Sequence, residues 1–190
     1  MLYSICRLIL LVLFKLLFRL QTIGSDFIPR KGAFIIASNH LSNLDPIVVG
    51  IASPRRLSFL AKEELFQLPI LSQLLPLLDV VPLRRNRADI FALKAGIKKL
   101  KQNCALALFP EGTRLLEGKK VYPGVGFLVS KTGVPVLPAK IYNTDKVLSP
   151  GKIIPALKKV KIIVGKPLLF DRNKKPEIIA QEVLAHIHSL

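Results

Sequence analysis

The chain has 190 residues, enough for one domain with a substantial hydrophobic core. Its formal net charge of +17 calls for an anionic partner, and its mean hydropathy of +0.43 is high for a purely soluble protein. Nucleic acid and an anionic membrane would both satisfy the charge. The absence of Trp, the presence of only three Tyr and the lack of a zinc or basic-helix motif argue against nucleic acid. We therefore expect an anionic membrane surface as partner, and no nucleic acid.

The first 21 residues are predicted to form a membrane-associated helix. Residues 2–20 are apolar except for a few side chains that share one stripe of a helix, namely Ser4, Arg7, Lys15 and Arg19. The longest unbroken apolar run, Leu8 to Phe14, has seven residues, whereas a spanning helix needs about 20. Lys15 and the lack of a cleavage site argue against a signal peptide. We expect a helix lying in one leaflet. A helix packed on the domain core and a marginal single span remain alternatives.

Residues 22–190 are predicted to form a single α/β domain. The expected strands are residues 33–38, 57–60, 79–83, 104–109, 135–142 and 159–164. The expected helices are residues 46–53, 62–76, 87–102, 124–132 and 176–189. Strands that alternate with helices at this spacing indicate a largely parallel central sheet flanked by helices.

The two cysteines, Cys6 and Cys104, form no disulfide framework. This usage favours a reducing, cytoplasmic environment. Together with the N-terminal segment, it predicts a peripheral or monotopic protein on the cytoplasmic face of the cell membrane. Residues 146–175 carry nine Lys or Arg against one acidic residue, which suits either a solvated edge or a second surface facing lipid headgroups.

The segment Asn39-His40-Leu41-Ser42-Asn43-Leu44-Asp45-Pro46 is the first candidate for chemistry. The apolar run of residues 33–37 is predicted to deliver His40 to the turn at the end of a strand. Asp45 follows five residues later, where its carboxylate can reach one imidazole nitrogen and leave the other free. A histidine oriented in this way is a general base for a hydroxyl. The residue pattern alone equally permits a structural His–Asp pair.

The segment Phe109-Pro110-Glu111-Gly112-Thr113-Arg114 is the second candidate. Its Gly permits close approach of backbone N–H groups to an anion, and Arg114 offers a planar fork for phosphate oxygens. Arg84-Arg85-Asn86-Arg87 is another phosphate candidate, and Lys62 adds charge at the end of a third strand. Solvated basic turns would explain these residues equally well.

No nucleophile motif accompanies His40. The chain has no Gly-x-Ser-x-Gly elbow, so a Ser-His-Asp hydrolase is not supported. His40 is instead expected to deprotonate a hydroxyl of the substrate. The other two histidines, His186 and His188, differ by two positions on a helix and would face apart, so no metal site is expected.

These motifs, in this order, resemble the four blocks of the glycerolipid acyltransferases, and above all the 1-acyl-sn-glycerol-3-phosphate (lysophosphatidic acid) acyltransferases. The first block is Asn39-His40-x4-Asp45 and the third is the segment from Phe109 to Arg114. The second covers Lys62 to Leu65 with Pro82-Leu83-Arg84-Arg85, and the fourth is Val134-Pro135-Val136-Leu137-Pro138. The resemblance covers about residues 25 to 165. Tyr122-Pro123-Gly124-Val125-Gly126 departs from the segment that usually follows the third block.

The resemblance implies transfer of an acyl group from a thioester to the sn-2 hydroxyl of lysophosphatidic acid, forming phosphatidic acid. His40 would be the general base and Asp45 its orienting partner. The implied substrate-binding residues are Lys62, Arg85, Glu111, Gly112, Thr113 and Arg114. No cofactor is implied, and the donor would be a thioester of acyl carrier protein or coenzyme A. Glycerol-3-phosphate or another lysolipid is the alternative acceptor. A non-catalytic basic module that binds membrane or nucleic acid is the alternative class.

Overall fold

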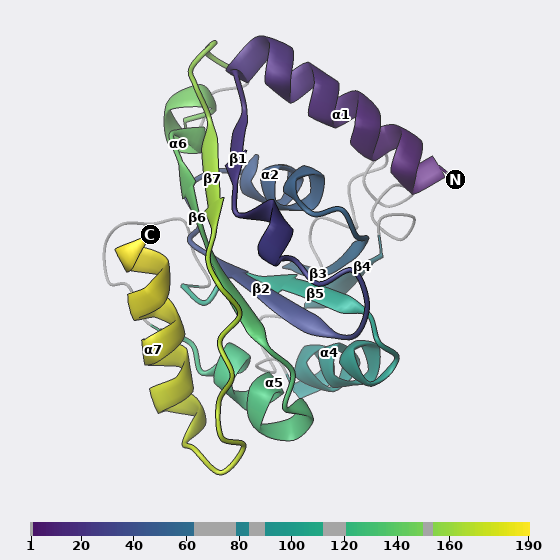
Figure 1. Cartoon of the computed structure of the whole chain (residues 1–190), viewed down its shortest axis with the longest axis vertical. Helices are drawn as coiled ribbons and strands as arrows, with labels where there is room; N and C mark the ends of the chain where they lie inside the picture. The colour runs from purple at the N-terminus through teal and green to yellow at the C-terminus, as the bar shows by residue number, and fades with distance from the viewer. Residues whose placement is uncertain (1, 63–78, 84–89, 112–120, 150–153) are drawn as a thin grey trace.

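The computed structural model describes residues 2–62, 79–83, 90–111, 121–149 and 154–190 (Figure 1). Seven strands form one sheet in the order β1-β7-β6-β2-β5-β3-β4. Their bounds are β1 Gln21–Ile23, β2 Phe34–Ser38, β3 Leu57–Lys62, β4 Val80–Leu83, β5 Ala105–Leu108, β6 Val136–Tyr142 and β7 Lys161–Val164. Every pairing is parallel except β6 with β7. The predicted α/β class with a largely parallel sheet is confirmed.

Helices cover both faces of the sheet (Figure 1). They are α1 Leu2–Phe18, α2 Asp45–Ala52, α4 Ile90–Lys101, α5 Gly124–Thr132, α6 Thr144–Val147 and α7 Pro176–Ser189, with a short 3-10 turn at Ser25–Phe27. Phe34 and Ile36 of β2 point into a core shared with α1 and α2. Ile35 and Ala37 point into a second core with α4, α5 and α7. The alternation of side chains along a strand explains this division, and an almost wholly apolar β2 serves both layers.

The predicted strands and helices match the observed ones closely. The helix expected at 176–189 and the helix expected at 124–132 have those bounds in the structure. The helix expected at 62–76 falls almost wholly outside the described residues. The strand β1 and the short helix α6 were missed by sequence reasoning, since three and four residues are too few to show a periodic pattern. Tertiary pairing with β7 is what makes residues 21–23 a strand.

Helix α1 has two apolar faces. Phe14 and Phe18 are buried in the core shared with α2, and the Arg7 guanidinium donates a hydrogen bond to the Ile51 carbonyl at 3.0 Å. One face of this helix is therefore packed on the domain core, which the sequence analysis gave as an alternative. The opposite face is exposed and consists of Ile5, Leu8, Ile9, Val12, Leu13, Leu16 and Leu17. We call these seven residues the α1 ridge. Within the described residues, no helix has the length and hydrophobicity that crossing a bilayer requires.

Candidate active site

The candidate residues gather where parallel strands end. β2 pairs with β5 so that Ala37 lies opposite Leu108, and β2 pairs with β6 so that Ser38 lies opposite Ala139. The loops after these three strands therefore leave the sheet on the same side, at the carboxyl ends of the strands. This is the usual place for binding sites in open α/β sheets. His40 follows β2 and Glu111 follows β5. The two candidate motifs therefore lie at the same end of neighbouring strands.

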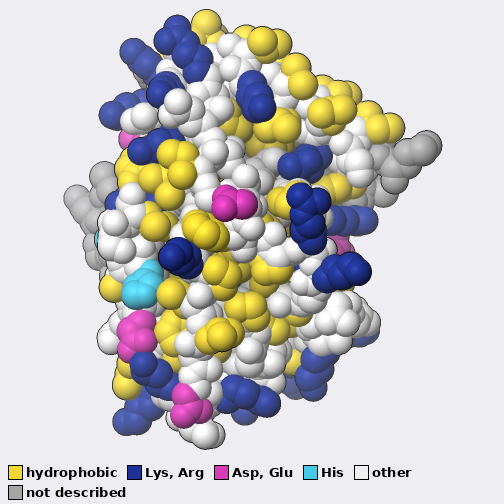
Figure 2. Space-filling view, in the orientation of Figure 1, with side chains coloured by type: hydrophobic (Ala, Val, Ile, Leu, Met, Phe, Trp, Pro, Cys, Tyr) yellow, Lys and Arg dark blue, Asp and Glu magenta, His cyan; other side chains and the backbone are white. Residues whose placement is uncertain are grey.

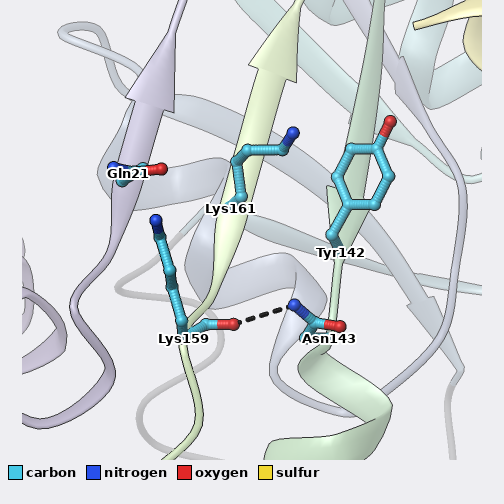
Figure 3. Close-up of a pocket in the computed structure, with 5 residues that line it drawn as sticks. All are labelled: Gln21, Tyr142, Asn143, Lys159 and Lys161. Atoms are coloured by element: carbon cyan, nitrogen blue, oxygen red, sulfur yellow. Dashed lines mark hydrogen bonds between the residues drawn. The ribbon is translucent and has the colours of Figure 1, made fainter.

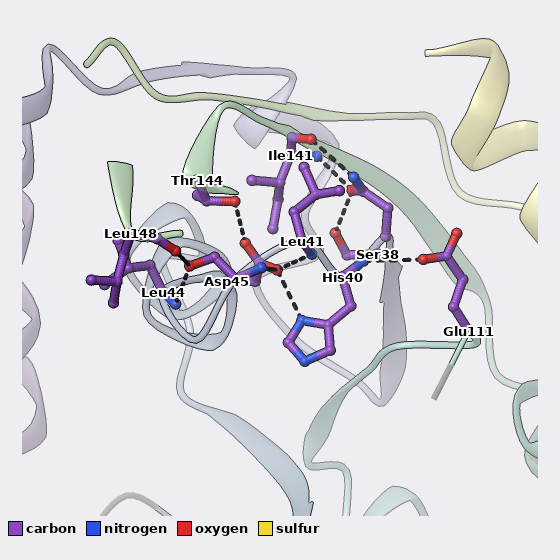
Figure 4. A network of polar contacts seen from close by, with 11 residues as sticks. Ser38, His40, Leu41, Leu44, Asp45, Glu111, Ile141, Thr144 and Leu148 are labelled. Carbon is purple, nitrogen blue, oxygen red and sulfur yellow. Dashed lines mark hydrogen bonds and ion pairs between the residues drawn. The ribbon is translucent and has the colours of Figure 1, made fainter. Parts of the chain in front are cut away.

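Asp45 is the buried centre of a hydrogen-bond network (Figure 4). Its Oδ2 atom lies 2.8 Å from His40 Nδ1 and accepts the backbone N–H groups of Leu41 at 2.5 Å and Ser42 at 2.7 Å. Its Oδ1 atom accepts the Thr144 hydroxyl at 2.6 Å. Asp45 is the first residue of α2 and is followed by a proline, so this carboxylate is held in the first turn of a helix. These partners compensate for the burial of a charge.

His40 is held by Asp45 on one side and by an aromatic ring on another. Its ring stacks on Phe109, with centroids 4.3 Å apart and planes at 20°. Its side chain retains 18% exposure. A carboxylate that accepts from Nδ1–H fixes the tautomer in which Nε2 carries the lone pair. Among the described residues Nε2 has no hydrogen-bond partner, so this atom is available to accept a proton.

Two further contacts fix the loop that carries His40. The Asn39 amide bridges to β6, donating to the Ile141 carbonyl at 2.9 Å and accepting the Ile141 N–H at 2.7 Å. The Ser42 hydroxyl donates to the Leu148 carbonyl at 2.9 Å. Both contacts cross more than a hundred positions of sequence. The histidine loop is therefore positioned by β6 and the segment after it, as well as by its own strand.

Glu111 is buried beside the same loop. Its Oε2 atom accepts the backbone N–H of His40 at 3.4 Å (Figure 4). Its Oε1 atom lies 3.5 Å from Nε2 of His188 on α7. The Glu111 side chain is 5% exposed, whereas that of His188 is 50% exposed. The structure thus brings together three of the residues that the sequence analysis singled out, His40, Asp45 and Glu111.

The remaining predicted binding residues are not placed by the described coordinates. Arg85, Gly112, Thr113 and Arg114 lie outside the described residues. Lys62 ends β3, where it pairs with Leu83 at the end of β4, but its side chain is not among those described. Within the described residues, no group of three potential metal ligands gathers.

Sequence reasoning missed Thr144, Phe109 and His188 as neighbours of the site. Phe109 lies inside the third motif and its place before Pro110 was visible, but nothing in the sequence predicts a ring stacked on His40. Thr144 lies two residues after the end of β6, and the end of a third strand was the available signal. His188 is brought in only by the packing of α7.

The site thus holds a partly exposed histidine whose Nδ1 lies 2.8 Å from a buried aspartate, an arrangement that suits proton transfer. Comparison with known families matches residues 19–142 to the acyltransferase family. This match covers more than half of the chain, and the chain therefore belongs to the acyltransferase family. The resemblance inferred from the motifs is confirmed at this level.

Within this family, the chain is similar to several 1-acyl-sn-glycerol-3-phosphate acyltransferases. The chain is 28% identical over 87% of its length to the 1-acyl-sn-glycerol-3-phosphate acyltransferase of Bacillus subtilis, covering 82% of that protein. It is 30% identical over 80% of its length to the chloroplastic enzyme LPAT1 of Arabidopsis thaliana, but spans only 43% of it. The crystal structure of the lysophosphatidic acid acyltransferase PlsC from Thermotoga maritima superposes with a TM-score of 0.70. It shares 31% sequence identity, covering 90% of this chain and 71% of that one.

Proposed function

We propose that this protein transfers a fatty acyl group from an acyl thioester to the sn-2 hydroxyl of lysophosphatidic acid, with His40 as general base. The observation that carries the proposal is the pairing of His40 Nδ1 with Asp45 Oδ2 at 2.8 Å. This pair lies at the carboxyl ends of the strands, beside Glu111. The names of the relatives support the choice of acceptor.

In the proposed reaction, Nε2 of His40 accepts the proton of the sn-2 hydroxyl as its oxygen attacks the thioester carbonyl carbon. The C–S bond then breaks, and the departing thiolate takes the proton from the imidazolium. Asp45 stabilises the imidazolium and keeps Nδ1 protonated. General-base catalysis of this kind contributes about 10²- to 10⁴-fold. No covalent acyl-enzyme is needed, because the acceptor itself supplies the nucleophile.

The phosphate of the acceptor is assigned to Arg85 and Arg114, as the motif resemblance implies. A guanidinium fork matches phosphate oxygens, and holding the phosphate fixes the hydroxyl near His40. Lys62, Gly112 and Thr113 are proposed to complete this site. The donor is proposed to be acyl carrier protein or coenzyme A carrying the acyl chain, and both are anionic as the basic surface requires.

The test of this function offers the purified protein two acceptors, lysophosphatidic acid and glycerol-3-phosphate, with each acyl thioester in turn. Phosphatidic acid formed from lysophosphatidic acid supports the proposal. If only glycerol-3-phosphate is acylated, it is the acceptor in place of lysophosphatidic acid. If neither acceptor is acylated and salt-sensitive binding to DNA is seen, the enzyme assignment to this substrate class is wrong. Arg114→Ala should raise KM for the phosphorylated acceptor more than it lowers kcat.

The α1 ridge is proposed to lie in one leaflet of the cytoplasmic face of the cell membrane. Leu16 and Ile9 are 74% and 60% exposed, which places large apolar side chains in water unless lipid covers them. Removal of the whole segment is a poor test, because Phe14 and Phe18 belong to the core. Ile9→Gln with Leu16→Gln should instead reduce binding to phosphatidylcholine vesicles by at least about tenfold, given the transfer energies of these side chains.

A matched control makes that experiment specific. Ile90→Gln with Phe91→Gln changes two equally exposed apolar residues on α4. The control should bind vesicles like the unmodified protein. Equal loss in both pairs would show that general hydrophobicity, rather than the α1 ridge, drives binding. Unchanged binding of the α1 pair would exclude the anchor.

A further inference from the structure

A cavity of about 280 Å³ lies at the β1–β7–β6 side of the sheet, and its lining does not include His40, Asp45 or Glu111 (Figure 3). The lining residues lie at the start of β1, the end of β6, the start of β7 and the segments next to β6 and β7. They are Gln21, Tyr142, Asn143, Lys159 and Lys161. We call this cavity the β-edge pocket. One water occupies about 30 Å³ in the liquid, so the volume accommodates a phosphate group with its ester substituents. None of the lining residues is acidic.

Among the residues that the structure describes, no Asp or Glu side chain pairs with the charged groups of the pocket. The Lys161 ammonium lies 4.5 Å from the centre of the Tyr142 ring, and the Lys140 ammonium lies 5.3 Å from the same ring. The Tyr142 hydroxyl donates to the Leu190 carbonyl at 2.8 Å, which fixes the ring. Within the part of the chain that the structure describes, neither Lys159 nor Lys161 has an ion-pair partner. Their positive charge is therefore available to an anion.

The backbone of the pocket is also fixed. The Asn143 side chain donates to the Lys159 carbonyl at 3.1 Å, tying the two flanks of the pocket together. Gln21 N–H donates to the Val160 carbonyl at 3.0 Å, and Val160 N–H donates to the Phe18 carbonyl at 2.9 Å. The last two bonds attach the pocket segment to the end of α1. The pocket segment is therefore bonded directly to the helix that carries the α1 ridge.

Basic side chains gather at this end of the molecule. Figure 2 shows Lys and Arg side chains grouped at the upper left, beside the band of hydrophobic side chains over α1. Exposed residues that the backbone bonds place at this end are Arg19, Lys158 and Lys159. Cations beside an apolar ridge match a membrane interface, where phosphates lie just outside the acyl chains.

The segment that lines the pocket also supports the candidate active site. Ile141 bonds to Asn39 and Thr144 bonds to Asp45, while Tyr142 and Asn143 between them line the pocket. A headgroup held in the pocket would thus fix the orientation of the His40 loop relative to the membrane surface.

From these observations we infer that the β-edge pocket binds the phosphate of an anionic lipid headgroup, at a site separate from the acceptor site. Lys159 and Lys161 supply the charge, and the Gln21 amide supplies a neutral donor. The inference rests on the proposed seating of α1 in a membrane. The preference for anionic over neutral vesicles measures the pocket, whereas binding to neutral vesicles measures the α1 ridge. Neither measurement requires acyl transfer, so failure of the proposed reaction is seen separately.

The experiment compares the full chain with Lys159→Gln/Lys161→Gln, using vesicles of phosphatidylcholine alone and of phosphatidylcholine mixed equally with phosphatidylglycerol. The double variant should bind the mixed vesicles about ten- to thirtyfold more weakly and the neutral vesicles equally well. Lys159→Arg/Lys161→Arg should retain the preference. The matched control, Lys98→Gln/Lys101→Gln on exposed positions of α4, removes the same charge and should lose much less.

Three outcomes would overturn the inference. Equal loss in the α4 control would mean that net charge alone attracts the membrane. Quenching of tyrosine fluorescence by inorganic phosphate, abolished in Lys159→Gln/Lys161→Gln while vesicle binding is unchanged, would make the pocket a free-phosphate site. Normal vesicle binding by that variant with weakened saturation by acyl carrier protein would assign the pocket to an acidic protein instead.

Discussion

Thr144 Oγ1 donates a hydrogen bond to Asp45 Oδ1 at 2.6 Å, across 99 positions of sequence. The other carboxylate oxygen serves His40, Leu41 and Ser42. Thr144 is thus the one described partner of Oδ1, and it leaves Oδ2 to the histidine loop. The segment after β6 thereby sets the orientation of the aspartate that orients the base.

Replacing Thr144 by Val should lower kcat by about tenfold, equivalent to about 1.4 kcal/mol, with little change in KM. The reason is that an unsatisfied Oδ1 on a buried carboxylate allows the plane of Asp45 to turn away from His40. Thr144→Ser should restore the rate. Thr132→Val is the control, since its hydroxyl also donates to an oxygen but on α5. A loss of stability without any change in kcat would limit Thr144 to a folding role.

Replacing His40 by Ala should lower kcat for lysophosphatidic acid by about 10²- to 10⁴-fold while acceptor binding persists. The loss follows because this variant lacks the proposed general base. His186→Ala, on the exposed side of α7, is the matched control and should keep full activity. Turnover retained by purified His40→Ala would refute the assignment of the base.

Glu111 and His188 should differ in their effects on kcat/KM. Glu111→Ala removes the acceptor of the His40 backbone N–H, so a substantial loss is expected. His188→Ala removes a half-exposed partner at 3.5 Å, for which a change of less than about fivefold is expected. Steady-state kinetics of both variants will show whether Glu111→Ala loses more kcat/KM than His188→Ala. If His188→Ala proves as damaging as Glu111→Ala, α7 contributes directly to the site.

The pH dependence of stability should carry a contribution from Asp79. Burial alone would raise its pKa, but hydrogen bonds from Lys99 and Ser58 outweigh burial and hold the pKa below its ordinary 3.8. A folded-state pKa below the unfolded value stabilises the fold above pH 3.8 and ceases to do so as the pH falls through the lowered pKa. Asp79→Asn should therefore lower the free energy of unfolding by less than about 1 kcal/mol at neutral pH, and by a smaller amount at acidic pH.

Urea unfolding of the unmodified protein and of Asp79→Asn, at neutral and at strongly acidic pH, measures this difference in the free energy of unfolding. An Asp79→Asn deficit that stays constant down to strongly acidic pH would contradict the linkage.

Helix α5 packs so closely on the start of α7 that Gly126 cannot carry a side chain. A Cβ at this position would lie 2.7 Å from the Pro176 Cα and closer still to its carbonyl. Gly126→Ala should lower the free energy of unfolding by about 1–3 kcal/mol through overpacking. Gly124→Ala meets only the Leu93 side chain at 3.7 Å and should be neutral or stabilising. Equal stability of the two variants would mean that α7 can shift.

The sequence by itself determined the fold class, most of the strands and helices, and the two motifs that carry the chemistry. Hydrophobic periodicity and turn residues are local properties, and β2 or α7 can be read from them without knowledge of the neighbours. The pairing of His40 with Asp45 is also local, since five positions and a proline confine it to one turn.

Only the tertiary structure decided which distant side chains complete the site. Thr144, Phe109 and His188 approach His40 or its partners because parallel strands end at one edge and α7 returns to it. It also decided the two faces of α1, where Phe14 and Phe18 enter the core and the α1 ridge stays exposed. Amphipathic patterning shows that a helix has apolar positions, but which of them meet protein depends on the surface that the rest of the chain presents.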